Sequence, residues 1–110
     1  MEESILITIK KKLGLGKEYN AFDTDVITNI NTSLMILGQL GVGPSNGFRI
    51  TGPSETWSNF VGDRIDLESI KDFIYIKARI VFDPPNSAAA LQALKEEAKE
   101  LEFRINVQVD

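Results

Sequence analysis

The sequence IDLESIKDFIYIKARIVFDPP, residues 65–85, carries the strongest helix signal in the chain. Between Phe73 and Phe82 only Lys77 and Arg79 are charged, so apolar side chains occupy most of the helix circumference. A helix that is apolar on most sides lies in the centre of a domain, with neighbours on several sides. We therefore predict that this segment is the central helix of a small helical fold.

The two ends of this central helix are also marked. Asp66 can accept hydrogen bonds from the first free backbone N–H groups, and Ile65 and Ile70 occupy the two positions of a hydrophobic staple. Pro84 disfavours the helical conformation at the residue before it, and Pro85 follows directly. The helix is therefore predicted to begin close to residue 66 and to end before residue 84.

Other segments repeat apolar residues at helical spacing or carry a helix start signal. They are residues 2–13, residues 23–40 with a stop at Gly41, the short residues 54–61 with Ser54 as the cap, and a last helix that follows a cap at Asn86 or Ser87. In the last helix the apolar stripe is narrow, which suits docking along one groove. The predicted fold class is all-α, a small bundle of four main helices with a short extra helix or loop insertion.

The C-terminus changes its pattern. Ile105, Val107 and Val109 alternate with polar residues, which is the period of a strand. A single terminal strand either pairs with an edge elsewhere, including that of a partner, or is disordered, and both outcomes stay open. We therefore expect residues 1–104 to form one helical domain and residues 105–110 to form an extended C-terminal tail.

Composition excludes several classes of function. The 110 residues contain no cysteine and no histidine, which removes disulfides, thiolate metal sites and the commonest general base. The net charge of −4 disfavours general affinity for nucleic acid. No apolar run approaches the ~20 residues of a membrane span, and the acidic residues before the first apolar residues oppose a signal peptide. We expect no enzyme activity, no catalytic residues, no cofactor, no metal site and no membrane.

Two charged clusters admit a second interpretation. Lys10, Lys11 and Lys12 could bind phosphate, but a solvated last turn favoured by the helix dipole is the stronger interpretation. Asp23 and Asp25 could be half of a metal site, but no third acidic ligand stands at a matching spacing. The sequence therefore favours helix capping for the two aspartates.

Residues 41–52, GVGPSNGFRITG, are rich in turn-forming residues and lack the Gly-Lys-Ser/Thr ending of a phosphate loop. We expect a projecting loop, and exposed loops often bind partners. Trp57 lies among uncharged and acidic neighbours, which favours a packing anchor over a nucleic-acid stacking platform. As a hypothesis, the partner-binding residues are Phe48, Arg49, Ile50, Trp57, Ile105, Val107 and Val109.

The chain resembles the small head–tail connector, or adaptor, proteins of long-tailed bacteriophages. The resemblance covers nearly the whole chain. It rests on the order of the elements and on five segments: SILITIKKKLG (residues 4–14), YNAFDTDVITNI (19–30), LGQLGVG (37–43), SETWSNFVG (54–62) and IKDFIYIKARIVFDPP (70–85). The family has no catalytic signature to match.

The resemblance implies a helical bundle that assembles as a homo-oligomeric ring, a dodecamer in the virion, beneath the portal protein. Such a ring bridges the portal to the stopper or tail-completion protein, and DNA passes through its channel without sequence-specific binding. It also implies a location at the head–tail interface of the virion, with assembly in the bacterial host cytoplasm. By analogy, the C-terminal segment is expected to reach toward the portal or an adjacent subunit.

An alternative is a small helical regulatory or DNA-binding module of a prophage. The acidic balance opposes it, and so does the lack of a basic recognition helix, because the central helix carries only Lys77 and Arg79 in its apolar part. Formation of a ring would support the connector function, and a monomer that binds duplex DNA with a steep salt dependence would support the regulatory module.

Overall fold

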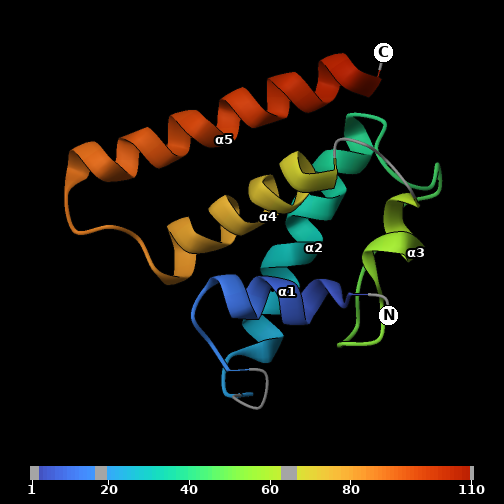
Figure 1. Cartoon of the computed structure of the whole chain (residues 1–110), viewed down its shortest axis with the longest axis horizontal. Helices are drawn as coiled ribbons and strands as arrows, with labels where there is room; N and C mark the ends of the chain where they lie inside the picture. Colours follow the sequence, from blue (N-terminus) through green and yellow to red (C-terminus); the bar gives the residue numbers. More distant parts are fainter. Residues whose placement is uncertain (1–2, 17–19, 63–66, 110) are drawn as a thin grey trace.

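The computed structural model describes residues 3–16, 20–62 and 67–109 of the chain. It contains five helices, which are α1 (Ile5–Lys12), α2 (Asp23–Gln39), α3 (Trp57–Val61), α4 (Leu67–Phe82) and α5 (Ala88–Val109) (Figure 1). In the described ranges the extended backbone pairing is a single isolated bridge between Ser4 and Thr56. The prediction of an all-α bundle is therefore confirmed. No described helix is long and apolar enough to cross a membrane.

Helix α4 is the centre of the bundle, as its sequence predicts. It packs against α5 on one side and against α1 and α2 on the other, and Figure 1 shows it lying between α5 and α1. Its side chains Ile70, Phe73, Ile74 and Ala78 are completely buried. The helix ends at Phe82, ahead of the two prolines. The predicted cap and staple at residues 65 and 66 lie outside the described residues.

Helix α1 does not end in a fully solvated turn, which corrects one expectation. Lys10 is 2% exposed, and its Nζ lies 2.8 Å from Asp23 Oδ1, at the start of α2. Lys11 and Lys12 are exposed, as expected. The contact also corrects the capping role of Asp23, because α2 begins at Asp23 after an N-cap residue, Phe22, that makes no side-chain cap bond. A buried ammonium needs a nearby carboxylate, and Asp23 supplies it.

Helix α5 begins as predicted, since Ser87 Oγ accepts a hydrogen bond from the backbone N–H of Ala90 at 3.0 Å. Its apolar stripe packs on α4, with Ala98 and Ile105 buried. The helix then continues to Val109, so the expected extended tail at residues 105–110 is wrong as far as residue 109. Seven residues separate Ala98 from Ile105, which places both on the same face of one helix. Burial of Ile105 on α4 outweighs a period-two pattern of only five residues.

Candidate assembly surfaces

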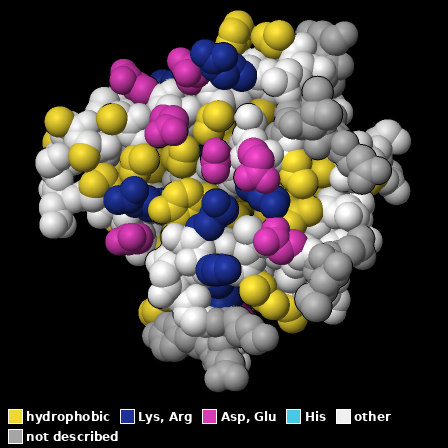
Figure 2. Space-filling view, viewed as in Figure 1, with side chains coloured by type: hydrophobic (Ala, Val, Ile, Leu, Met, Phe, Trp, Pro, Cys, Tyr) yellow, Lys and Arg dark blue, Asp and Glu magenta, His cyan; other side chains and the backbone are white. Residues whose placement is uncertain are grey.

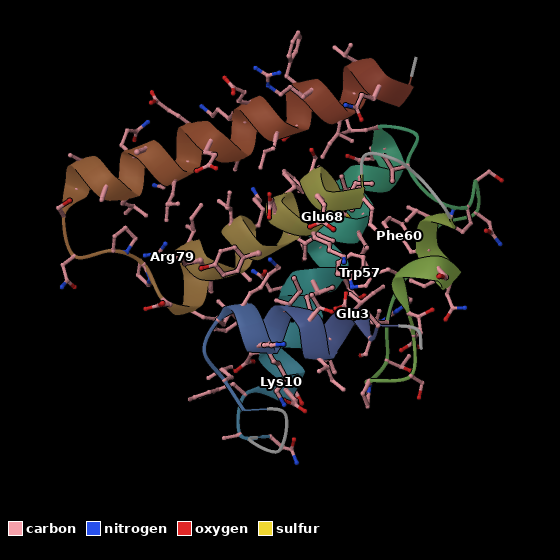
Figure 3. The ribbon with its side chains drawn as sticks, in the orientation of Figure 1. Glu3, Lys10, Trp57, Phe60, Glu68 and Arg79 are labelled. Carbon is pink, nitrogen blue, oxygen red and sulfur yellow. The ribbon has the colours of Figure 1, made fainter. Side chains whose placement is uncertain are left out.

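The junction of α1, α3 and α4 is organised around Trp57, which is 3% exposed. Its indole Nε1 donates a hydrogen bond to Thr8 Oγ1 at 3.0 Å, and the Lys71 ammonium lies 5.6 Å from the ring centroid. Lys71 Nζ also donates to Glu3 Oε1 at 2.9 Å, and Figure 3 shows Glu3 beside Trp57. Trp57 is therefore an internal anchor, and its side chain is not available to a partner on the subunit surface.

The charges at this junction are held by one another. The Lys71 ammonium holds the pKa of the Glu3 carboxyl below its ordinary value, chiefly through the direct hydrogen bond. Partial burial acts to lower the pKa of Lys71, but the bond and charge of Glu3 and the charge of Glu68 outweigh it, so that pKa is raised. The Glu3–Lys71 pair therefore links the segment before α1 to α4.

Backbone contacts fasten the segment before α3 to the start of α1. Ile5 donates its N–H to the Glu55 carbonyl at 3.1 Å, and Trp57 donates its N–H to the Glu3 carbonyl at 3.2 Å. Helix α3 is capped by Thr56 in a capping box with Asn59, not by Ser54 as expected. These bonds fix α3 against the bundle although the helix has only five residues.

The loop of residues 42–52 is held to α2 at Ile50, whereas its residues 44–47 are exposed, as a projecting loop predicts. The Asn31 side chain of α2 clamps the loop, since its Nδ2 donates to the Ile50 carbonyl at 2.9 Å and its Oδ1 accepts from the Ile50 N–H at 2.7 Å. Ile50 is completely buried, and the Phe48 ring packs on Phe60 with the ring centroids 5.2 Å apart. One helix residue therefore holds a loop that follows it by 19 positions.

The loop and α2 together form the walls of a groove, which we call the α2 groove. Its volume is about 860 Å³. Besides the exposed Gly38, five exposed helix residues along it recur at spacings of three and four, and the loop contributes Phe48, Arg49 and Ile50. The helix residues are Thr24, Thr28, Thr32, Met35 and Gln39. Arg49 is the one charged side chain in the described lining of this groove.

The groove is less polar than its threonines suggest. Thr28 Oγ1 donates to the Thr24 carbonyl at 3.0 Å, and Thr32 Oγ1 donates to the Thr28 carbonyl at 3.1 Å. Both hydroxyl protons are therefore used inside the helix, and covering these residues would leave neither of these two hydroxyl donors without a partner. Met35 is 58% exposed in the same row. The α2 groove is thus a surface that a partner can cover at low cost.

A second apolar surface lies on α5, opposite its buried stripe. Phe103 is 67% exposed and Val107 is 55% exposed, and their spacing of four residues places them side by side on the helix. Surrounding residues on this outer face are charged, including Glu96, Lys99 and Glu100. We call this surface the α5 outer face. Two neighbouring exposed apolar side chains on a helix are typical of a contact site.

The third surface is a smaller hollow of about 220 Å³, which lies where the end of α1 meets the end of α4. Its lining residues are Leu13, Leu15, Phe22, Val81, Phe82 and Asp83. Val81 is 59% exposed, so the hollow opens to the surface. Its size suits a single side chain better than a helix face.

The hypothetical partner-binding residues separate into two groups. Ile50, Trp57 and Ile105 are buried inside the subunit, so their side chains do not form a partner surface in this structure. Arg49 and Val107 are exposed and Phe48 is half-buried in the groove wall. The side chain of Val109 lies outside the described set.

The partner-binding residues predicted from the sequence do not include Met35 or Phe103, although one feature of the sequence indicates the groove. Residues 26–48 contain no charged residue, even though five positions of α2 within this range are exposed. An exposed helix face in water usually carries charge. An uncharged one indicates a surface that becomes covered.

Catalytic and metal-binding arrangements do not emerge in the described part of the chain. No group of three Asp or Glu side chains there lies close enough to hold a metal ion. On the face shown in Figure 2, acidic and basic side chains are interspersed among apolar ones, without a continuous basic band. This face has no electrostatic track for a nucleic-acid backbone.

Comparison with known proteins identifies the family. Neither a curated protein nor a solved structure gives a significant match. A family model described as "Phage connector protein" matches residues 5–110, which is almost the entire chain. The helical bundle and its exposed apolar surfaces agree with a structural part of a phage particle. The chain therefore belongs to the phage connector protein family and has the structural role of a bacteriophage head–tail connector.

Proposed function

We propose that this chain is the adaptor subunit of a long-tailed phage or prophage, that it forms a homo-oligomeric ring beneath the portal protein, and that it joins the portal to the stopper or tail-completion protein. The number of subunits in the virion ring is proposed to be twelve, as the family resemblance implies. The site of action is the head–tail interface, after assembly in the host cytoplasm.

The observation that carries this proposal is the distribution of exposed apolar side chains. Met35 in the α2 groove, Phe103 on the α5 outer face and Val81 at the small hollow are each more than half exposed, and they lie on three different helices. Exposed apolar side chains on three helices offer a chain of 110 residues more than one surface for contacts. A ring subunit has two lateral neighbours and further partners above and below, and each contact needs a surface.

The proposal assigns no chemistry to the chain. No catalytic, cofactor or metal site is assigned, and DNA is proposed to pass through the ring without sequence-specific binding. The net charge of −4 supports passage, because an acidic wall does not hold the phosphate backbone.

Electron microscopy and analytical ultracentrifugation of the purified chain, alone and mixed with the portal protein of the same phage, test this function. We expect closed rings that sit on the portal. A monomer that ignores the portal and binds duplex DNA with a steep salt dependence would instead support the regulatory alternative.

A further inference from the structure

We propose that the α5 outer face of one subunit lies in the α2 groove of the next subunit, and that this contact closes the ring. The inference rests on the proposed function, since it names the lateral surfaces of that ring. Its two halves come from different parts of the same chain, so it is a contact between a second copy and the first.

The α2 groove has the features of a surface made to be covered by a helix. It is about 860 Å³ in volume and runs along α2 from Thr24 to Gln39, which is about four turns of helix. Met35 and the exposed threonines form an uncharged wall, and Phe48 belongs to the wall on the loop side. Helix-in-groove recognition uses a row of apolar side chains at helical spacing as the inserting element.

The α5 outer face supplies two neighbouring apolar side chains of this kind, Phe103 and Val107. With Phe103 as reference, a helical spacing of three or four residues leads to Val107 in one direction and to Glu100 and Glu96 in the other. The buried residue Ile105 lies on the opposite side of the helix, against α4. The packing of α5 on its own subunit therefore leaves Phe103 and Val107 free to insert elsewhere.

The charges of the two surfaces are complementary. The described groove lining offers one charge, the exposed cation of Arg49, and no carboxylate opposes an acidic partner there. The α5 outer face presents Glu96 and Glu100 beside Lys99, and Glu100 also pairs with Arg104 next to this face, which leaves the Glu96 carboxylate for a cation of the neighbouring subunit. With Phe103 in the groove, pairing of Glu96 with Arg49 would favour this orientation over contact between two grooves or two α5 helices.

The arrangement of the helices makes this contact heterologous. Helix α4 packs against both α2 and α5, so the two surfaces belong to different layers of the bundle (Figure 1). When one patch of a subunit binds a different patch of its neighbour, each added subunit presents the same free patch again, and the series ends when the rotation closes. A ring is the closed product of such a contact.

The small hollow is a weaker receptor for α5. Its volume of about 220 Å³ is too small for two neighbouring side chains such as Phe103 and Val107 together with their helix. Asp83 belongs to its lining and would repel the glutamates of the α5 outer face.

Cysteine crosslinking tests the contact, because the chain has no cysteine of its own. Met35→Cys and Val107→Cys are combined in one chain and treated with a short bismaleimide, alone and on the portal protein of the same phage. We expect a ladder of crosslinked species on a denaturing gel, up to the full ring. The matched control combines Val107→Cys with Val81→Cys, whose side chain is 59% exposed against 58% for Met35. We expect no ladder from the control pair.

Each outcome decides between the surfaces. A ladder from the control pair, or rings in the microscope with no ladder from the Met35 pair, overturns the groove assignment and leaves the proposed ring function standing. Crosslinks from the thiol introduced at position 35 to the portal, in place of a ladder, also overturn it, since the portal then occupies the groove. Absence of rings with and without the portal overturns both the inference and the proposed function.

A second variant series separates packing from folding. Phe103→Asp is expected to raise the concentration for half-maximal ring formation about 30-fold or more, as loss of a hot-spot residue does. Phe103→Leu is expected to stay within a few fold of the wild type, and both variants should melt like it as monomers. Unchanged ring formation by Phe103→Asp contradicts the inference.

Discussion

Helices α4 and α5 lie side by side and use apolar residues for opposite purposes. In α4 the apolar residues surround the helix, and Ile70, Phe73 and Ile74 are completely buried. In α5 one narrow stripe faces α4, while Phe103 and Val107 point to the outside. Two phenylalanines on adjacent helices thus differ from complete burial to 67% exposure. The comparison teaches that α4 holds the subunit together, whereas part of the apolar surface of α5 is left for contacts beyond it.

The largest expected effect comes from truncating the two phenylalanines of this comparison, Phe73 in α4 and Phe103 in α5. Phe73→Ala removes a fully buried ring and should lower the free energy of unfolding by about 3–5 kcal/mol. Phe103→Ala is the matched control and should change it by about 0.5 kcal/mol or less. Urea denaturation followed by circular dichroism measures both. Equal losses would show that α5 does not differ from α4 in this way.

The next effect contrasts a buried ion pair with an exposed one. Asp23→Ala removes the carboxylate that lies 2.8 Å from the Lys10 ammonium, in a site where the lysine is 2% exposed, and we expect a loss of about 3 kcal/mol. Glu100→Ala removes the α5 ion pair to Arg104, whose two side chains are both 66% exposed. That change should cost under about 0.5 kcal/mol. Thermal melting compares the two, and an Asp23→Ala variant as stable as the wild type would refute a structural role for the Lys10–Asp23 pair.

A smaller effect tests whether the loop of residues 42–52 is packed as tightly as the core around α4. Gly43 has a φ of 88°, and a Cβ there would lie 2.4 Å from the Phe60 ring. Gly43→Ala should therefore cost about 1–3 kcal/mol. Gly38→Ala, inside α2 with open space at the Cβ, should instead raise the free energy of unfolding by about 0.5–1 kcal/mol. The difference in melting temperature between the two alanine variants measures this, and a neutral Gly43→Ala would mean that the loop yields.

The smallest effect concerns pH. Because the pKa of Glu3 is lowered in the fold, the unfolded chain binds its proton more readily, and the Glu3–Lys71 pair stabilises the fold above the ordinary carboxyl pKa of 4.5. This contribution is lost as the pH falls through the lowered pKa. Since Glu3 is 62% exposed, the contribution should stay under about 1 kcal/mol. Glu3→Gln should remove this part of the stability loss at low pH. The urea concentration at the unfolding midpoint, measured over a series of pH values, tests this. An identical pH series would mean that the pair adds no stability.

The sequence predicts the part of the fold that local pattern controls. The apolar run of α4, the glycine after α2 and the cap at Ser87 each act over a few residues, and each prediction agrees with the structure. The family resemblance led to the same bundle, and the match over residues 5–110 confirms it.

The parts that the sequence did not predict depend on residues far apart in the chain. Lys10 is buried because Asp23 reaches it from the next helix, and the loop lies on α2 because Asn31 clamps Ile50. Neither pair has a recognisable spacing. The apparent strand after residue 104 shows the converse error, since packing on α4 overrides a short local alternation. Among the predicted partner-binding residues Arg49 and Val107 are exposed, and their contact with a partner stays a prediction, while Met35 and Phe103 were not among them.

The attachment of α5 also orders the way the subunit opens. The helix follows a double proline, and among the described helices it packs mainly on α4, whereas α4 is held from several sides. Its 22 residues can separate as a block without disturbing α1 and α2. Amide hydrogens of α5 should then exchange with solvent deuterons together and ahead of those of α4, and a neighbouring subunit that covers the α5 outer face would slow this exchange.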